Sequence, residues 1–484
     1  MVDLVVHRFD GALKAEHGTG RNMAPFVETE WGSEAVGIMR RLKNAVDPHG
    51  LLNPDVILTS RPKLHLENMK DLPVVEEVVD KCVECGACEP RCPSRDFTLS
   101  PRQRIVLRRA RERMVSVGKV ELAKQLDRDY EFAGKASCAT DGLCALDCPV
   151  AINTGELIKQ LRSKSTGRVD SAIASMLGAH FGLAERLVHL SLLVGRGTSA
   201  IIGDTALRSI TTILAKAFPG FPQWHAALAT DQGAMDRSLM SDLESAEYIY
   251  WPTCMSRMMG GTADALLRVC SKADVAVRIP RDALGMCCGQ AFSSKGYLDV
   301  AVRKQNELLD AIWQWSNHGQ RPVVLDLGSC TSFLKTGLPY LDPVRKHRLE
   351  SLPILDSTEL AARLLPRLSI TKKIGSVAIH SVCSNHRHGW EVPLLEVARA
   401  CAENVQAPHE GKCCGMGGDR GFEIPGLALS ATADVASKMA DAKCESGFTN
   451  ARSCAISLNS GSGRPWRSIF RLLDECSVGF TGGG

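Results

Sequence analysis

The sequence lacks several features that would place it in a class at once. Its most apolar stretch, residues 171–197, is interrupted by Glu185, Arg186 and two histidines, which is typical of an amphipathic or core helix rather than a membrane span. The net charge is only +4 over 484 residues, so no general affinity for nucleic acid follows. The start, MVDLVVHRFDG, is not a secretory signal, because an acidic residue comes at once. We therefore expect a cytoplasmic protein without a nucleic-acid partner.

Cysteine, by contrast, is abundant, with 19 residues in the chain. Disulfide-rich domains are short and exported, so a disulfide scaffold explains this chain poorly. Metal binding in a reducing compartment is the better explanation. The distribution is also uneven, since residues 1–60 contain no cysteine and residues 73–165 contain seven among predicted helices.

One cysteine run has the spacing of a bacterial ferredoxin half-site. CVECGACEPRCP, residues 82–93, is a complete C-x2-C-x2-C-x3-C-P pattern. Zinc sites use two separated C-x2-C pairs, so a triplet followed by Cys-Pro favours an iron–sulfur cluster. In two-cluster modules the fourth cysteine of each run binds the other cluster. The predicted ligands of the first cluster are therefore Cys82, Cys85, Cys88 and Cys148.

A second run, CATDGLCALDCP (138–149), departs from this pattern at one position, where Asp141 replaces a cysteine. The same crossing rule assigns Cys92, Cys138 and Cys144 to the second cluster and leaves one place for Asp141. A carboxylate is a harder iron ligand than a thiolate, which would shift the potential and make that iron easier to lose. The alternative is that Asp141 only caps a turn, beside a three-iron cluster or a water ligand.

A basic run, PRQRIVLRRARERM (101–114), lies between the two cysteine runs. Ser100 and Pro101 are good residues for the N-cap and the first position of a helix. We interpret the arginines as a solvated helix face in the first place, a docking surface in the second, and a nucleic-acid contact last.

From about residue 245 the sequence favours alternating strands and helices, and it contains an internal repeat. WPTCMSRM, GMCCGQAF and LDLGSCTSF are followed in the same order by HSVCSNHR, GKCCGMGG and TNARSCAIS. In each half a cysteine follows an apolar strand, at the edge where open α/β sheets place their sites. The eight cysteines of the repeat are Cys254, Cys287, Cys288 and Cys330, then Cys383, Cys413, Cys414 and Cys454.

This repeat resembles the cysteine-rich CCG domain of heterodisulfide reductases and of iron–sulfur subunits of glycerol-3-phosphate and lactate dehydrogenases. The resemblance covers roughly 245–480 and implies that the eight cysteines bind metal. The family pattern closes each half with C-x2-C, whereas Phe333 and Ser457 hold the last place here. Four thiolates per half remain, enough for one conventional cluster. The alternative is that these cysteines are buried or vestigial.

Two further sets of residues near the repeat are less telling. Four cysteines fit no pattern and are interpreted as core thiols: Cys270, Cys401, Cys444 and Cys476. Four histidines near the second half are weaker candidates for a ligand or a proton-transfer group: His380, His386, His388 and His409.

The first residues resemble the carboxyl end of an FAD-linked oxidase of the vanillyl-alcohol oxidase type, in particular the D-lactate and D-2-hydroxyacid dehydrogenases. The motifs AEHGTGR and DPHGLLNPDVIL carry this resemblance. It implies that Glu16 and His17 are catalytic, with His17 removing the substrate hydroxyl proton while hydride passes to the flavin. It also implies that Asn53 approaches the flavin. The alternative is that Glu16 and His17 belong to an ordinary loop.

These observations predict a multidomain α+β chain, in an order that resembles the long fused D-lactate dehydrogenases. No Gly-rich nucleotide fingerprint is present, so we expect FAD only if a missing domain or a partner supplies it. The predicted domains are a carboxyl-terminal fragment of an FAD-linked oxidase (1–62), an α-helical two-cluster ferredoxin domain (73–165), a helical connector (166–240) and an α/β CCG domain (245–480) with repeats at about 245–340 and 375–470.

The expected function is the iron–sulfur electron-transfer portion of a flavin-dependent D-lactate or 2-hydroxyacid dehydrogenase. The expected cofactors are two 4Fe-4S clusters, the second Asp-ligated or 3Fe-4S, with further clusters in the CCG domain. The expected partners are a flavin-bearing domain or subunit, a 2-hydroxyacid and a quinone or cytochrome-type acceptor, and peripheral attachment to the inner face of a membrane is left open. The alternatives are a stand-alone iron–sulfur subunit of a glycerol-3-phosphate or glycolate dehydrogenase type, a redox sensor, and disulfide reduction at the CCG motifs.

Overall fold

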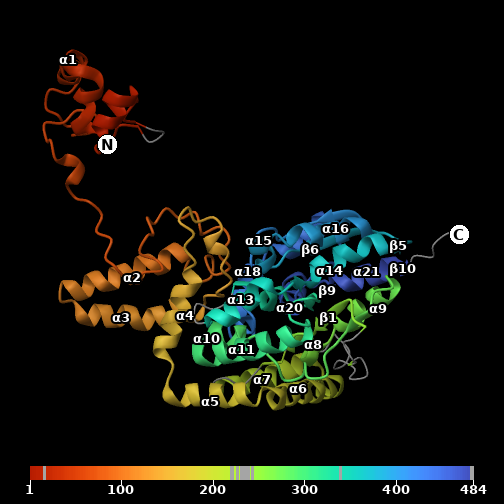
Figure 1. Cartoon of the computed structure of the whole chain (residues 1–484). Helices are drawn as coiled ribbons and strands as arrows, with labels where there is room; N and C mark the ends of the chain where they lie inside the picture. Colours follow the sequence, from red (N-terminus) through yellow and green to blue (C-terminus); the bar gives the residue numbers. More distant parts are fainter. Residues whose placement is uncertain are drawn as a thin grey trace. The chain divides into compact units, whose positions relative to one another are not determined.

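The computed structural model describes residues 1–14, 18–217, 223–224, 228, 240, 245–336 and 341–479. The chain divides into two compact units, Met1–Pro73 and Val74–Gly484. Helices and strands are both present, and the strands all lie in the second unit among the residues described (Figure 1).

The first unit is small and helical. It contains η1 (Leu4–Arg8), η2 (Ala24–Phe26), α1 (Val27–Val46) and η3 (Leu64–Leu66). Few of its apolar side chains are buried, namely Ala24, Val27, Val36 and Leu64. The turn after α1 is held by Asp47, whose carboxylate accepts the N–H groups of Leu51 and Leu52. The hydrogen bond from Lys43, 2.6 Å away, together with these N–H groups lowers the pKa of Asp47 to about 2.

The second unit begins with a cysteine-bearing loop followed by helices. These helices are α2 (Pro101–Ser116), α3 (Val120–Tyr130), η4 (Glu131–Ala136), η5 (Leu143–Ala145) and α4 (Thr154–Ser165). The predicted start of α2 is confirmed, because Ser100 forms a capping box with Gln103 and Pro101 is the first helical residue. The interpretation of its arginines as a solvated face is wrong for two of them, since Arg104 and Arg109 are 1% and 2% exposed.

Three helices follow: α5 (Arg168–Ala179), α6 (Phe181–Ile202) and α7 (Asp204–Ala217). Within the described ranges, no single helix is long and apolar enough to cross a membrane, and the pair α5 and α6 meets that length and composition only across an 89° bend. These helices expose a large set of apolar side chains, including Ile173, Met176, Leu183, Leu187, Leu190, Val194, Ile201, Ile210 and Ile213.

Two four-stranded parallel sheets form the centre of the remaining chain. The first contains β1 (Tyr248–Trp251), β2 (Val277–Arg278), β3 (Val323–Leu325) and β4 (Ile354–Asp356) in the order β2-β1-β3-β4. The second contains β6 (Ile374–His380), β7 (Ala402–Gln406), β8 (Gly447–Thr449) and β9 (Trp466–Ser468) in the order β7-β6-β8-β9. The two orders are equivalent strand by strand, so each half of the repeat contributes one sheet.

Helices cover these sheets. The first half contributes α8 (Cys254–Met259), α9 (Ala263–Lys272), α10 (Gln290–Lys295), α11 (Leu298–Trp315), α12 (Gly328–Thr336), α13 (Pro343–Ser351), α14 (Ser357–Leu364) and η8 (Leu365–Arg367). The second contributes α15 (Cys383–His388), α16 (Glu391–Cys401), α17 (Arg420–Glu423), α18 (Pro425–Ala431), α19 (Val435–Asp441), α20 (Arg452–Ser462) and α21 (Ile469–Cys476).

The two halves exchange elements with each other. Helix α14 packs against α16 of the second half, and α21 packs against α9 of the first. The short strands β5 (Leu368–Ile370) and β10 (Ser477–Gly479) pair antiparallel, so each half ends beside the end of the other. A single hydrophobic core therefore runs through both sheets, and it contains the four cysteines that were interpreted as core thiols.

Candidate metal centres

The first ferredoxin-type site brings together cysteines from both runs. The thiol of Cys88 interacts with those of Cys148 and Cys82, and burial is the main reason why the pKa of Cys88 rises to about 11. Cys82 and Cys148 pack against one small core formed by Val79, Ile105, Ile152 and Leu157. Cys85 is exposed on the loop between Cys82 and Cys88. The structure thus brings Cys148 close to Cys82 and Cys88, and their role as ligands stays a prediction.

The second ferredoxin-type site gathers the other predicted set. Cys92 interacts with Cys138 and Asp141, and Cys144 interacts with Asp141, Cys138 and Cys92. Burial, then the neighbouring charge of Asp141, raises the pKa of the Cys144 thiol. Thiols with a raised pKa are protonated at neutral pH, so metal binding at this site would release protons.

Asp141 is shared between the second ferredoxin-type site and the second half of the repeat. Its carboxylate accepts the N–H of Leu143 at 2.8 Å, which is the turn-capping role, and it also hydrogen-bonds the thiol of Cys413. Burial raises the pKa of this carboxyl, and both hydrogen bonds oppose that rise. Leu143 and Cys413 belong to one buried apolar cluster. Residues about 270 positions apart therefore meet at Asp141.

Helix α2 supplies a buried arginine to each ferredoxin-type site. At the first site, Arg109 forms an ion pair of 2.8 Å with the buried Glu84. It also donates to the carbonyl oxygens of Cys82 and Asp80, at 2.9 and 3.1 Å. Arg109 therefore cross-links the loop that carries the first cysteines, and its charge is balanced by a carboxylate.

The arginine at the second site is balanced differently. Arg104 donates to the carbonyl oxygen of Leu99, the hydroxyl of Ser94 and the sulfur of Cys92, at 2.5, 2.9 and 3.9 Å. Among the described residues it forms no ion pair with a carboxylate. Burial opposes its charge, yet the interaction with the sulfurs of Cys138 and Cys92 raises the pKa of Arg104. A buried guanidinium without an anion costs several kcal/mol, and the acidic groups that interact with Arg104 are the carboxyl of Asp141 and the thiols of Cys92 and Cys138.

In the first half of the repeat, four thiols form a contiguous group. The sulfur atoms of Cys288 and Cys330 lie 3.1 Å apart. The free thiol of Cys287 is hydrogen-bonded to those of Cys254 and Cys288. The hydrogen bond to Cys287 and burial raise the pKa of Cys254 well above its usual value. Cys254 begins α8 directly after β1, and Cys330 lies on α12 after β3, so both come from the carboxyl ends of neighbouring parallel strands.

A buried ion pair anchors this first group. Arg257 on α8 binds Glu185 of α6 through both carboxylate oxygens, at 2.5 and 3.1 Å. It also donates to the carbonyl oxygens of Pro252 and Met286, which precede the cysteine-bearing turns. Sequence reasoning missed this pair, although Glu185 stands out as an acid inside an apolar stretch.

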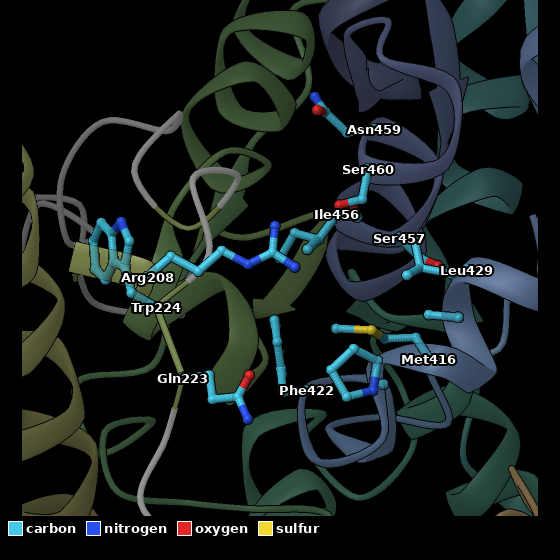
Figure 2. A pocket seen from close by; sticks show the side chains of 13 residues that line it. Arg208, Gln223, Trp224, Met416, Phe422, Leu429, Ile456, Ser457, Asn459 and Ser460 are labelled. Atoms are coloured by element: carbon cyan, nitrogen blue, oxygen red, sulfur yellow. The ribbon is translucent and has the colours of Figure 1, made fainter. Parts of the chain in front are cut away.

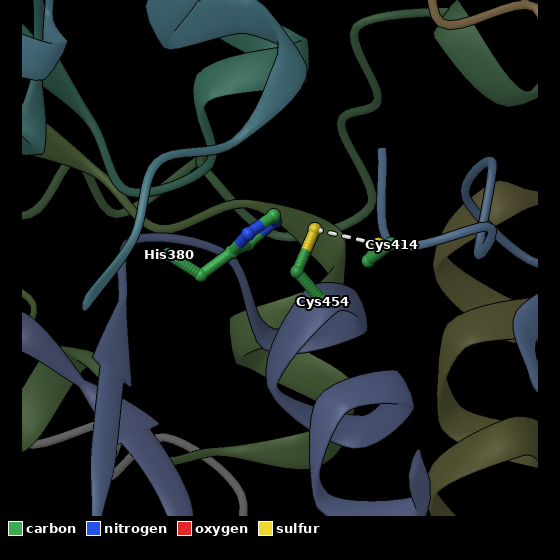
Figure 3. A group of neighbouring side chains, drawn as sticks. All are labelled: His380, Cys414 and Cys454. Carbon is green, nitrogen blue, oxygen red and sulfur yellow. Dashed lines mark hydrogen bonds between the residues drawn. The ribbon is translucent and has the colours of Figure 1, made fainter. Parts of the chain in front are cut away.

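The second half forms the equivalent thiol group. The sulfur atoms of Cys414 and Cys454 lie 3.1 Å apart, and the thiols of Cys383 and Cys413 are hydrogen-bonded to each other. The hydrogen bond to Cys413 and burial raise the pKa of Cys383 well above its usual value. This group also includes a histidine. A ring nitrogen of His380 and the sulfurs of Cys414 and Cys454 all lie within 4.8 Å of one another (Figure 3).

The other three candidate histidines have defined partners. His409 donates from Nε2 to the carbonyl oxygen of Cys413 at 3.1 Å. His386 contacts Glu391 at 2.8 Å, and His388 bonds to the hydroxyl of Ser332 at 2.8 Å. Burial lowers the pKa of His388 to about 4, so this residue is neutral at physiological pH.

A pocket of about 250 Å³ lies beside the second thiol group. Arg208 of α7 reaches across it toward Ile456, and Trp224, Phe422 and Met416 line it (Figure 2). Ser457, also on the wall, donates its hydroxyl to the carbonyl oxygen of Cys414 at 2.7 Å, so the wall of the pocket contacts the loop that carries this cysteine.

The predicted flavin-site residues are less informative in this structure. Glu16 and His17 lie outside the described residues. Asn53 is exposed in a turn with φ of 44°, a left-handed conformation that asparagine tolerates well. Its role stays a prediction.

Comparison with protein families defines the class of each segment. Residues 1–57 match the carboxyl-terminal domain of FAD linked oxidases, and residues 76–152 match a 4Fe-4S dicluster domain. Residues 248–335 match a cysteine-rich (CCG) domain, which is the first half of the repeat. Three segments of the chain thus match an FAD linked oxidase carboxyl-terminal domain, a 4Fe-4S dicluster domain and a cysteine-rich domain, as the motifs predicted.

Individual relatives match this chain over part of its length. A D-2-hydroxyglutarate dehydrogenase from Xanthomonas citri is 41% identical over 49 residues, and a mitochondrial D-lactate dehydrogenase [cytochrome] from Kluyveromyces lactis is 39% identical over 56 residues. Each match covers 10% of the relative and 10% or 12% of this chain. One subunit of the anaerobic glycerol-3-phosphate dehydrogenase of Escherichia coli is 26% identical over 144 residues, 28% of this chain and 35% of the relative.

Proposed function

We propose that this chain is the iron–sulfur electron-transfer portion of a flavin-dependent D-lactate or 2-hydroxyacid dehydrogenase. The observation that carries the proposal is the contact between Asp141 and Cys413, which joins the second ferredoxin-type site to the second half of the repeat. This contact brings together two cysteine systems that are distant in sequence, which supports an electron relay between them.

The order of the relay follows from this contact. Iron–sulfur clusters, when bound, supply one-electron carriers. We place one cluster on Cys82, Cys85, Cys88 and Cys148, and a second on Cys92, Cys138 and Cys144 with Asp141 as ligand or neighbour. The second site is the proposed exit, because Asp141 connects it to Cys413 of the repeat. The two thiol groups of the repeat are the proposed sites of further metal.

The chemistry at the entry belongs to a flavin that another domain or subunit supplies. The match of residues 1–57 to the FAD linked oxidases supports this part of the proposal. His17 is the proposed base for the substrate hydroxyl, Glu16 its partner, and Asn53 the residue that approaches the flavin. D-Lactate is the first candidate substrate, because a D-lactate dehydrogenase is among the relatives of this chain.

A quinone-type ring is the proposed acceptor, and the pocket beside Ser457 is its proposed place. The lining is largely apolar and aromatic, with the guanidinium of Arg208 available to a carbonyl oxygen. Helix α7, which carries Arg208, continues the layer of α5 and α6 with its many exposed apolar side chains. We propose that this layer attaches the protein peripherally to the inner face of a membrane, where quinones are dissolved.

The second candidate is a stand-alone iron–sulfur subunit without catalysis of its own. The likeness to one subunit of an anaerobic glycerol-3-phosphate dehydrogenase favours it, because that match covers a larger share of this chain than the matches to the D-2-hydroxyglutarate and D-lactate dehydrogenases do. Residues 1–57 favour the first candidate, since they match an oxidase domain.

The deciding experiment is to measure iron, acid-labile sulfide and flavin on the full chain, purified without oxygen. About eight irons per chain means two ferredoxin clusters, and about sixteen means that the repeat holds clusters as well. Almost no iron would overturn the proposal. Bound flavin would overturn the claim that FAD comes from elsewhere.

A functional readout completes this test. With a 2-hydroxyacid-oxidising flavoprotein present, D-lactate should reduce the chain and then an added quinone. Cys82→Ser should stop quinone reduction but leave flavin reduction intact. Cys270→Ser is the matched control, because Cys270 is a buried core thiol outside every proposed site. Quinone reduction by Cys82→Ser at the rate of the control would contradict the relay.

A further inference from the structure

The second half of the repeat holds a histidine with an unusual environment. His380 is the last residue of β6, at the sheet edge where the cysteines gather, and its side chain is 1% exposed. Within the described part of the chain, neither of its ring nitrogens has a hydrogen-bond partner. Buried polar groups are nearly always partnered, so an imidazole left bare at both nitrogens needs an explanation.

The ring faces two thiols rather than a hydrogen-bond acceptor. A nitrogen of His380 and the sulfurs of Cys414 and Cys454 lie within 4.8 Å of one another, and the two sulfurs are 3.1 Å apart (Figure 3). In a tetrahedral metal site with bonds of about 2.0 to 2.3 Å, neighbouring ligand atoms stand roughly 3.5 to 3.8 Å apart. Small side-chain movements would therefore suffice to bind one metal atom among these three donors.

The described part of the first half has a tryptophan, not a metal-binding side chain, at the equivalent position. Trp251 ends β1 three residues before Cys254, and His380 ends β6 three residues before Cys383. The family's closing cysteine is also absent in both halves, replaced by Phe333 and Ser457. Ser457 does not take over that role, because its hydroxyl is turned to the carbonyl oxygen of Cys414. The second half therefore has four thiols and an imidazole, and the first has four thiols.

We propose that His380 is a metal ligand of the second half, with Cys414 and Cys454 as its sulfur partners. This inference rests on the proposed function, in which the repeat holds metal. Thiolate and imidazole suit both zinc and iron, so the ligand set fits an iron of an iron–sulfur cluster or a single zinc ion. The two halves of the repeat are then different metal centres, one all-thiolate and one mixed.

His409 provides a matched control for this assignment. Its ring lies 5.3 Å from that of His380 and is equally buried, but its Nε2 is already used on the carbonyl oxygen of Cys413. A His409→Gln variant keeps a side-chain donor for that carbonyl and changes the same wall of the site. If a change in the wall of the site were enough to release the metal, His409→Gln would lose it too. If the metal is lost only because His380 is a ligand, His409→Gln keeps it.

The experiment measures iron, sulfide and zinc per chain in the full-length protein purified without oxygen. His380→Leu removes the donor and keeps the volume, and His380→Cys replaces one ligand with another. We expect His380→Leu to lose the metal of the second half, and His380→Cys and His409→Gln to retain it. In protein labelled with ¹⁵N-histidine, nitrogen coupling in the EPR spectrum, or a nitrogen shell in zinc X-ray absorption, reports the ligand directly.

Each outcome either supports or overturns the assignment of His380 as a metal ligand. Loss of iron with sulfide identifies a cluster, and loss of one zinc identifies a mononuclear site; both support the assignment. Full metal content in His380→Leu, without a histidine nitrogen at any metal, overturns it and leaves the relay intact. Wild-type protein with only the eight ferredoxin irons overturns it together with metal in the repeat. If His380→Leu does not fold, the nitrogen signal of the wild type decides alone.

Discussion

The two ferredoxin-type sites are built on the same helix and differ in how a buried charge is balanced. At the first site, Arg109 meets the carboxylate of Glu84, so the pair is close to neutral. At the second site, Arg104 donates to carbonyl groups, hydroxyl groups and the sulfur of Cys92, and it interacts with the carboxylate of Asp141 without forming a direct ion pair among the residues described. The first arginine is a structural cross-link, whereas the second is a fixed positive charge beside the sulfur ligands.

This difference predicts the direction of electron flow. A positive charge near a cluster stabilises the reduced form, because reduction adds negative charge, and so raises the potential. The second site should therefore hold an electron more tightly than the first. It is also the site that touches the repeat through Asp141. The charge pattern and the contact pattern thus favour the same order.

The largest effect should follow from unpairing the arginine of the first site. Arg109→Leu removes the guanidinium that pairs with the buried side chain of Glu84, and breaking a buried ion pair costs about 3–5 kcal/mol of unfolding free energy. Urea unfolding of the variant and the wild type measures this difference in unfolding free energy. The double variant with Glu84→Leu should recover most of the lost stability. A single variant as stable as the wild type would show that the ion pair does not stabilise the fold.

A smaller effect, on potential rather than stability, should follow at the second site. Arg104→Leu removes one positive charge and should lower the second cluster's potential by on the order of 100 mV, the size of a unit-charge interaction at a few ångströms in a partly polarisable interior. Arg104→Lys keeps the charge and should retain most of the potential. An EPR-monitored redox titration resolves the two clusters, and equal shifts at both would refute the asymmetry.

The smallest expected effect is a change in potential when Asp141, the one non-cysteine residue of the ferredoxin pattern, is replaced. Asp141→Cys completes the ferredoxin pattern, so the second cluster should persist with a changed potential, because a thiolate replaces a harder oxygen donor. The same titration measures the change, with the first cluster as internal reference. An unchanged potential would mean that Asp141 only caps the turn to Leu143 and contacts Cys413.

Local patterns predicted much of this molecule. The crossing of cysteines between two runs places Cys148 with Cys82 and Cys88, and a capping signal at Ser100 locates the start of α2. Both depend on short-range chemistry, namely ligand spacing and the N–H groups of a helix end. The equivalent strand orders of the two sheets likewise follow two matching stretches of sequence.

Pairings between distant residues were missed for a physical reason. Arginines 104 and 109 look alike in a basic run, and only packing against Glu84 and Cys92 separates them. The hydrogen bond between Asp141 and Cys413 joins the ferredoxin-type segment to the repeat, and neither cysteine motif predicts it. His380 was one of four histidine candidates until its empty hydrogen-bond environment distinguished it.

The exchange of helices between the halves of the repeat bears on how the chain folds. Because α14 packs on α16 and α21 packs on α9, neither half can complete its own apolar core before the other is synthesised. Contacts over such long sequence separations form late and unfold together. The two thiol groups should consequently become competent for metal in one cooperative step, after the last helix has left the ribosome, and a nick near residue 371 should release both metals at once.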